Sequence, residues 1–135
     1  MCAELRAVLP RTLDAGAQAR RLIEGTFAGE AGAGCVCDLQ IAVSEMVNNA
    51  VVHGSGEIVL HAEIRQDVVH IEVSDEGLGT PAIRAQPDGD MGGWGMRIVD
   101  RLARAWGTSE AGSVWADLPV ASGLRCPAAT PAQPA

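Results

Sequence analysis

The sequence predicts an α+β fold, in which a mixed, mostly antiparallel sheet packs against helices on one of its faces. Residues 57–65 and 69–74 alternate between polar and apolar side chains on either side of a turn at residues 66–67. This is the pattern of an antiparallel pair with one buried and one solvated face. Apolar residues recur every three or four positions in residues 39–51 and again in residues 96–103, which predicts helices. A chain of 135 residues is the size of one domain.

The N-terminal elements follow from turn and capping residues. Ala3–Leu9 reads as a strand, which the following proline ends. Thr12 or Asp14 can cap a helix that runs to about Ala28. Gly29–Gly34 is a run of small residues and is predicted to be a loop between this helix and the next.

The C-terminal third is predicted to complete the sheet. Trp106–Glu110 and Ser113–Pro119 look like two closing strands around a turn at Ala111-Gly112. Beyond them, residues 120–135 are rich in Pro and Ala, and we expect this tail to be disordered. The predicted domain therefore covers residues 1–119.

The charge of the chain bears on its partners. The net charge is −7, and all ten cationic residues are Arg. An acidic chain without a basic stripe argues against direct binding to nucleic acid and to an anionic membrane surface. No apolar run approaches the roughly 20 residues of a membrane span, and the N-terminus lacks the order of a signal peptide. These features predict a cytoplasmic protein.

The four cysteines do not form a recognisable metal motif. Cys35 and Cys37 are the only close pair, and Cys2 and Cys126 are remote from them. A structural zinc site needs four ligands at suitable spacing, so reduced thiols are the expectation. A redox role for Cys35 and Cys37 stays open.

The helix predicted over Asp38–Gly54 carries the first candidate site. Its apolar residues extend nearly all round, which is typical of a buried helix, yet Glu45 and Asn49 lie four positions apart on one face. Burying a carboxylate and an amide is unfavourable unless a hydrogen-bond partner, a metal or a ligand satisfies them. The two side chains indicate either a pocket or a solvated side of the helix, and this segment alone does not decide between them. Gly54 suits the position just past the helix end.

Asp75 is the second candidate. It follows the strand of residues 69–74 in phase with the buried side chains, so its carboxylate points toward the helix layer if the strand continues that far. An inward carboxylate at a strand end needs a partner. Asp75 is therefore either a binding residue or a cap for the loop that follows.

Glycines provide the third candidate. Gly77 and Gly79 open a loop rich in Gly and Pro, and Gly93 and Gly95 end it at the start of a predicted helix. Free backbone N–H groups and the helix dipole make such a start suitable for an anion. The chain has no lysine and therefore no P-loop, and it has no dinucleotide fingerprint after a strand.

Three segments, taken in order, resemble the boxes of the GHKL family of ATP-binding domains, which includes histidine kinases, gyrase and mismatch-repair ATPases. SEMVNNAVVHG resembles the N box, VSDEGLGTP the first glycine box and GGWGMRIVDRLARAWG the second. The resemblance covers roughly residues 3–119 and is strongest to bacterial anti-sigma-factor serine kinases and their small actinobacterial relatives. It implies the Bergerat two-layer sandwich, with ATP held between the helices and a lid.

The resemblance also implies roles for four side chains. Asn49 would coordinate Mg²⁺ that bridges the ATP phosphates, and Asp75 would accept a hydrogen bond from the adenine amino group. Glu45 looks like the general base. Ser113 stands where the family tends to have a Thr near the adenine, although the strand parity there is ambiguous.

The glycines would act through the backbone. Gly77 and Gly79 would let the chain approach the base, and Gly93 and Gly95 would present N–H groups to the phosphates. One departure concerns charge: between Gly79 and Gly92 the only cation is Arg84. Phosphoryl transfer depends on the stabilisation of charge. With so few cations there, slow turnover and ATP binding without transfer are both alternatives.

The function implied is that of an anti-sigma-factor regulator that binds a sigma factor and uses Mg²⁺ and ATP to phosphorylate a Ser or Thr on a small antagonist protein. Arg20 and Arg21 in the first helix are a candidate partner surface. Pairing of two copies stays open, since the family often forms dimers. The alternative is a non-catalytic binding module that is gated by nucleotide.

Overall fold

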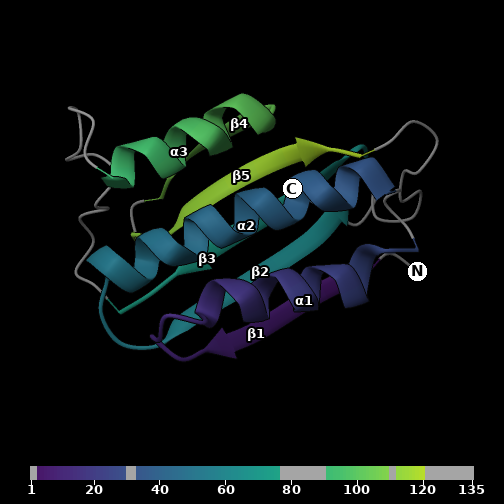
Figure 1. Ribbon diagram of the computed structural model, residues 1–135. Helices are drawn as coiled ribbons and strands as arrows, with labels where there is room; N and C mark the ends of the chain where they lie inside the picture. Colours follow the sequence, from purple (N-terminus) through teal and green to yellow (C-terminus); the bar gives the residue numbers. More distant parts are fainter. Residues whose placement is uncertain (1–2, 30–32, 77–90, 110–111, 121–135) are drawn as a thin grey trace.

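The computed structural model describes residues 3–29, 33–76, 91–109 and 112–120, with the backbone alone for residues 33–35 and 91–95. Within them the chain forms an α+β two-layer sandwich (Figure 1). The elements in order are β1 (Glu4–Leu9), α1 (Ala15–Phe27), α2 (Ala33–His53), β2 (Ile58–Arg65), β3 (Val68–Ser74), α3 (Met91–Leu102), β4 (Ala105–Thr108) and β5 (Val114–Pro119).

The described strands form a single sheet in the order β1-β2-β3-β5-β4. All four pairings in it are antiparallel, whereas the sequence predicted a mixed sheet. The predicted pair of alternating strands is confirmed as the hairpin β2–β3, in which Leu60 faces Val73 and Ile64 faces Val69. Gln66 turns this hairpin with a positive φ of 56°.

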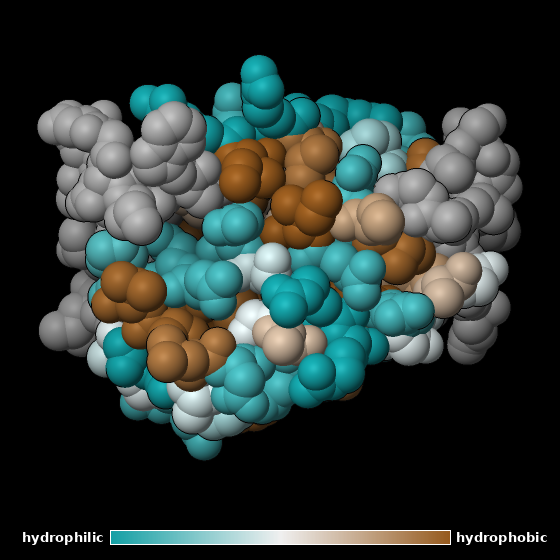
Figure 2. Space-filling model, viewed as in Figure 1, coloured by the Kyte–Doolittle hydropathy of each residue, from teal (hydrophilic) through white to brown (hydrophobic). Residues whose placement is uncertain are grey.

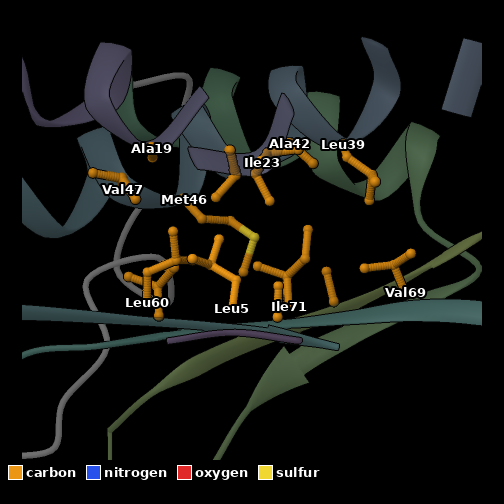
Figure 3. Close-up of a cluster of buried hydrophobic side chains, with 14 of the residues drawn as sticks. Leu5, Ala19, Ile23, Leu39, Ala42, Met46, Val47, Leu60, Val69 and Ile71 are labelled. Carbon is orange, nitrogen blue, oxygen red and sulfur yellow. The ribbon is translucent and has the colours of Figure 1, made fainter. Parts of the chain in front are cut away.

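The three helices cover one face of the sheet, with α2 between α1 and α3 (Figure 1). Side chains from both layers meet in one hydrophobic core (Figure 3). Met46 of α2 reaches down between Leu60 and Ile71 of the sheet, and all three are buried. The alternate residues of the strands lie on the opposite face, which is therefore polar; among them are His61, Glu63, His70 and Glu72, all half-buried.

Both Gly-rich helix starts lie earlier than the sequence predicted. Helix α2 begins at Ala33 inside the predicted loop, and α3 begins at Met91 instead of after Gly95. A glycine in a helix costs only about 1 kcal/mol. For α2, the extension buries Val36 in the core, and burying a valine side chain contributes about 1.5–3 kcal/mol.

The outer side of α2 differs from the expectation of burial nearly all round. Ile41 and Val52 are exposed, at 43% and 68% of their surface. Apolar side chains gather on this side of the molecule over α2 and α3 (Figure 2), where Ile98 of α3 is also exposed. Helix α2 is therefore buried against the sheet and its two neighbouring helices, and open on its fourth side.

Two further expectations concern the ends of elements. Asp14 precedes α1, but its side chain makes no capping bond to the helix backbone. The predicted tail lies outside the described residues apart from Val120, whose N–H donates to Asp67 O at 3.0 Å. Among the described helices, none combines the length and apolar character that crossing a membrane requires.

Candidate functional site

The side chain of Asn49 stands out on α2. It lies on the side of the helix next to the open one, and its Oδ1 is buried. Among the described residues, this is the one buried side-chain oxygen or nitrogen without a hydrogen-bond partner. An uncompensated buried oxygen costs about 1–3 kcal/mol. An amide oxygen is also a ligand that a hard cation such as Mg²⁺ prefers, so the residue fits a metal-bound nucleotide.

Glu45 lies one turn before Asn49 on the same side of α2 and is half-buried. A spacing of four residues places the two side chains next to each other on the helix. The structure therefore brings a carboxylate and an unsatisfied amide oxygen together at the boundary between buried and open surface.

The C-terminal end of α2 is fixed by a cation from another part of the chain. Arg11, in the connection between β1 and α1, donates from Nη2 to Val51 O and to Gly54 O, both at 2.7 Å. The last carbonyls of a helix have no partner within it, and a cation there is favourable with the helix dipole. Sequence patterns did not single out Arg11, because its partners lie 40 and 43 residues away.

Asp75 lies at this same end of α2. A β-carbon on Gly54 would come within 2.6 Å of Asp75 Cγ, so the carboxylate occupies the space that the missing side chain leaves. Next to this contact, Glu76 N–H donates to Ser55 O at 2.8 Å. The carboxylate is thus held at the helix layer, and by the 1.5 Å rise per residue Gly54 lies about 7.5 Å along the axis from Asn49.

A second glycine shapes the same loop. Gly56 has a φ of +70°, and the Glu76 side chain lies where a β-carbon of Gly56 would be. The Glu76 carboxylate also accepts the Glu57 N–H at 3.4 Å. The segment between α2 and β2 therefore encloses the residues that follow β3.

Ser113 lies elsewhere. Its hydroxyl donates to Glu72 Oε2 at 2.6 Å and lies 2.8 Å from Ser109 Oγ. Val73 and Val114, which pair across β3 and β5, are both buried toward the helices, so Glu72 and Ser113 lie on the opposite face. The sequence left open which face of the sheet the Ser113 side chain is on, and the structure places it on the face away from Asn49 and Asp75.

The glycines divide into two groups. Gly77 and Gly79 lie outside the described residues, as does Arg84. Gly93 and Gly95 lie in the first turns of α3. Since an α-helix leaves its first four N–H groups free, the N–H of Gly93 belongs to the free set and that of Gly95 falls within the helix.

Residues 9–114 match the sequence model of the histidine kinase-like ATPase domain, a description that implies ATP binding.

Curated relatives include proteins named anti-sigma F factor. The one from Clostridium beijerinckii is 32% identical over 81 residues, which cover 50% of this chain and 57% of the relative. The one from Geobacillus stearothermophilus is 32% identical over 78 residues, covering 48% and 53%. The chain spans about half the length of these relatives. Because the family match extends over most of the sequence, the chain belongs to the histidine kinase-like ATPase domain family.

Proposed function

We propose that the chain binds Mg²⁺ and ATP at the side of α2 that carries Glu45 and Asn49. The observation that carries this proposal is the buried Oδ1 of Asn49, which lacks a partner among the described residues. Coordination to Mg²⁺ would supply that partner, and the ion would offset the negative charge of the phosphates.

The base is proposed to bind at the other end of the site. Asp75, held against Gly54, would accept a hydrogen bond from the adenine amino group. The backbone of Gly77 and Gly79 would lie along the base. Of the two glycines of α3, Gly93 would direct its free N–H at the phosphates, whereas Gly95, whose N–H falls within the helix, would only leave room for them. Ser113 is left out, because its hydroxyl lies on the opposite face of the sheet.

The proposed reaction is phosphorylation of a Ser or Thr on a small antagonist protein. Glu45 would take the proton from the acceptor hydroxyl, whose oxygen attacks the γ-phosphorus. The bond between the γ-phosphorus and the β–γ bridging oxygen would break, and ADP would leave with that oxygen. A half-buried carboxylate one turn from Asn49 is in a suitable place for this role.

The partners are proposed from the relatives named anti-sigma F factor. They are a sigma factor and the antagonist that would release it, which makes the chain a regulator of transcription. Arg20 and Arg21 are exposed on α1, outside the proposed ATP site, and are the candidate contact with these partners. We propose that the protein acts in the cytoplasm.

The composition favours a second candidate function. Between Gly79 and Gly92 the only cation is Arg84, so this segment offers little positive charge to stabilise a transferring phosphoryl group. A module that binds ATP and changes its affinity for a partner, without transfer, would need no such stabilisation.

Incubation with γ-labelled ATP, Mg²⁺ and the antagonist protein separates the two functions. Label on the antagonist that disappears in Glu45→Gln, while this variant still binds ATP, is the expected result for a kinase. Asp38→Asn, which removes an exposed carboxylate from the same helix, is the matched control and should retain transfer. ATP binding without transfer by the wild type would favour the binding module.

A further inference from the structure

Arg11 lies at this end of the molecule and has no part in the proposed function. It is exposed, yet its guanidinium makes two hydrogen bonds of 2.7 Å to Val51 O and Gly54 O. Bonds from a charged donor are stronger than neutral ones. The two bonds restrain the connection between β1 and α1 against the end of α2, and their strength offsets the rotamer freedom that an exposed arginine side chain loses when it is held in this way.

The two carbonyls belong to the point where α2 ends. Gly54 N–H donates to Ala50 O at 2.8 Å and so closes the last turn of the helix, while Gly54 O is held by Arg11. Gly54 is therefore held on both sides of its Cα. Without Arg11, its carbonyl would keep only the restraint of the following loop.

Gly54 in turn bears directly on Asp75. The carboxylate fills the space beside the Gly54 Cα, where even one added carbon would overlap it. A shift of Gly54 toward Asp75 would push the carboxylate away, and a shift in the other direction would loosen the contact between them. The position of the Asp75 carboxylate thus depends on the position of Gly54.

We infer that Arg11 is a positioning residue for base recognition: by fixing Gly54 it sets the place of the Asp75 carboxylate, and with it the preference for adenine over guanine. This inference rests on the proposed function. Adenine presents an amino group, which donates to a carboxylate. Guanine presents a carbonyl oxygen at the same position, which a carboxylate repels. Displacing the carboxylate therefore weakens the binding of ATP, and it relieves the repulsion of GTP, so the ATP-to-GTP affinity ratio falls.

The affinities for ATP and GTP, measured by calorimetry with Mg²⁺, test this inference. Because a hydrogen bond to a charged group contributes strongly to discrimination, Arg11→Gln is expected to lower the ATP-to-GTP affinity ratio by about tenfold. Arg6→Gln makes the same change of charge in β1, at a position exposed on the far face of the sheet, and should keep the ratio of the wild type. Arg11→Lys retains the cation without the planar guanidinium, and should give a ratio between those of wild type and Arg11→Gln.

A role limited to capping the helix would give another result. Arg11→Gln would then unfold at a lower temperature with its ATP-to-GTP ratio intact, and the inference would be overturned while the proposed ATP site stands. If Arg11→Gln does not fold, the ratio in Arg11→Lys decides in the same way. A wild-type protein that binds both nucleotides equally would instead contradict base recognition by Asp75, and the inference would be overturned, whereas the binding of Mg²⁺ and ATP at Asn49 would stand.

Discussion

The carboxylate of Asp75 lies directly against the Cα of Gly54, in the space that a β-carbon would occupy. The contact joins the end of β3 to the end of α2, although the two residues are far apart in the sequence. In this chain, which belongs to the histidine kinase-like ATPase domain family, the contact gives the glycine just after α2 a specific task. The glycine leaves room for the carboxylate that we propose to bind the base.

Gly54→Ala should therefore impair nucleotide binding more than folding. The added methyl group overlaps the Asp75 carboxylate and comes within 2.8 Å of Ala50 O, and relieving such an overlap typically costs about 1–3 kcal/mol of stability. Calorimetry should show a loss of ATP affinity, and urea denaturation should show a folded protein with a lower midpoint. Gly25→Ala on α1, where an added β-carbon meets nothing, is the control. Unchanged ATP affinity in Gly54→Ala would contradict the place of Asp75 in the site.

Asn49→Ala should lose Mg²⁺-dependent ATP binding without a loss of stability. The variant removes a buried oxygen that has no partner among the described residues. Such an oxygen costs about 1–3 kcal/mol, which offsets the contacts that are lost. Nucleotide titrations with and without Mg²⁺, together with urea denaturation, give both quantities. The neighbouring Asn48, exposed on the same helix, provides the control Asn48→Ala, which should bind as the wild type does. An Asn49→Ala protein that binds ATP normally would assign this amide to the fold alone.

The start of α1 should make a pH-dependent contribution to stability. The Thr12 hydroxyl donates to Asp14 at 2.5 Å, and the Gln18 amide donates at 3.1 Å. These bonds, the Thr12 bond first, lower the pKa of Asp14 from its ordinary value of 3.8. A carboxyl with a lowered pKa stabilises the folded state above its unfolded pKa, and this contribution is lost as the pH falls through the folded value.

Wild type and Asp14→Asn should thus differ in urea midpoint at pH 7 and converge as the pH falls below about 4. Because Asp14 is exposed, the difference should be small. Glu24→Gln, which removes an exposed carboxylate from α1, is the control for the loss of one negative charge at pH 7. A difference between wild type and Asp14→Asn that persists unchanged at pH 3 would assign the effect to side-chain shape.

Much of the fold could be predicted because its signals are local. Polar and apolar side chains alternate from one residue to the next in residues 58–74, and this local pattern is enough to predict the hairpin β2–β3. The sequence predicts the starts of α2 and α3 too late, because glycine is a loop signal. The energetic penalty of a glycine in a helix is small, and tertiary packing at Val36 outweighs it. That packing depends on the sheet, which a local pattern does not contain.

The candidate site likewise combines features that local spacing predicts with contacts between distant parts of the chain. Glu45 and Asn49 share a helix, so their spacing alone predicts that they are neighbours. The contact of Asp75 with Gly54 and the two bonds of Arg11 join residues that are 21 to 43 positions apart in the sequence. Residue types in one segment give no sign of such a partner. Long-range contacts of this kind require the folded chain.

At Ser113, next to the end of a strand, the sequence does not give the direction of the side chain. Ser109 N–H donates to Ser113 O at 2.9 Å, and Ser113 lies one residue before β5. The alternation of side chains along β5 therefore does not by itself give the direction of the Ser113 side chain. In the folded chain its hydroxyl is buried against Glu72 on the face away from the helices. Removing that donor leaves the carboxylate with one partner fewer.

Ser113→Ala should therefore lower the free energy of unfolding by about 1–2 kcal/mol and keep the ATP affinity of the wild type. Ser113→Thr retains the hydroxyl and should recover most of the stability. Urea denaturation and nucleotide titration of both variants measure the two effects separately. Loss of ATP affinity in Ser113→Ala with unchanged stability would place this hydroxyl beside the adenine instead. Whether Ser113→Ala loses stability or ATP affinity thus shows which face of the sheet the Ser113 side chain lies on, because no single orientation of that side chain can reach both Glu72 and the helix layer.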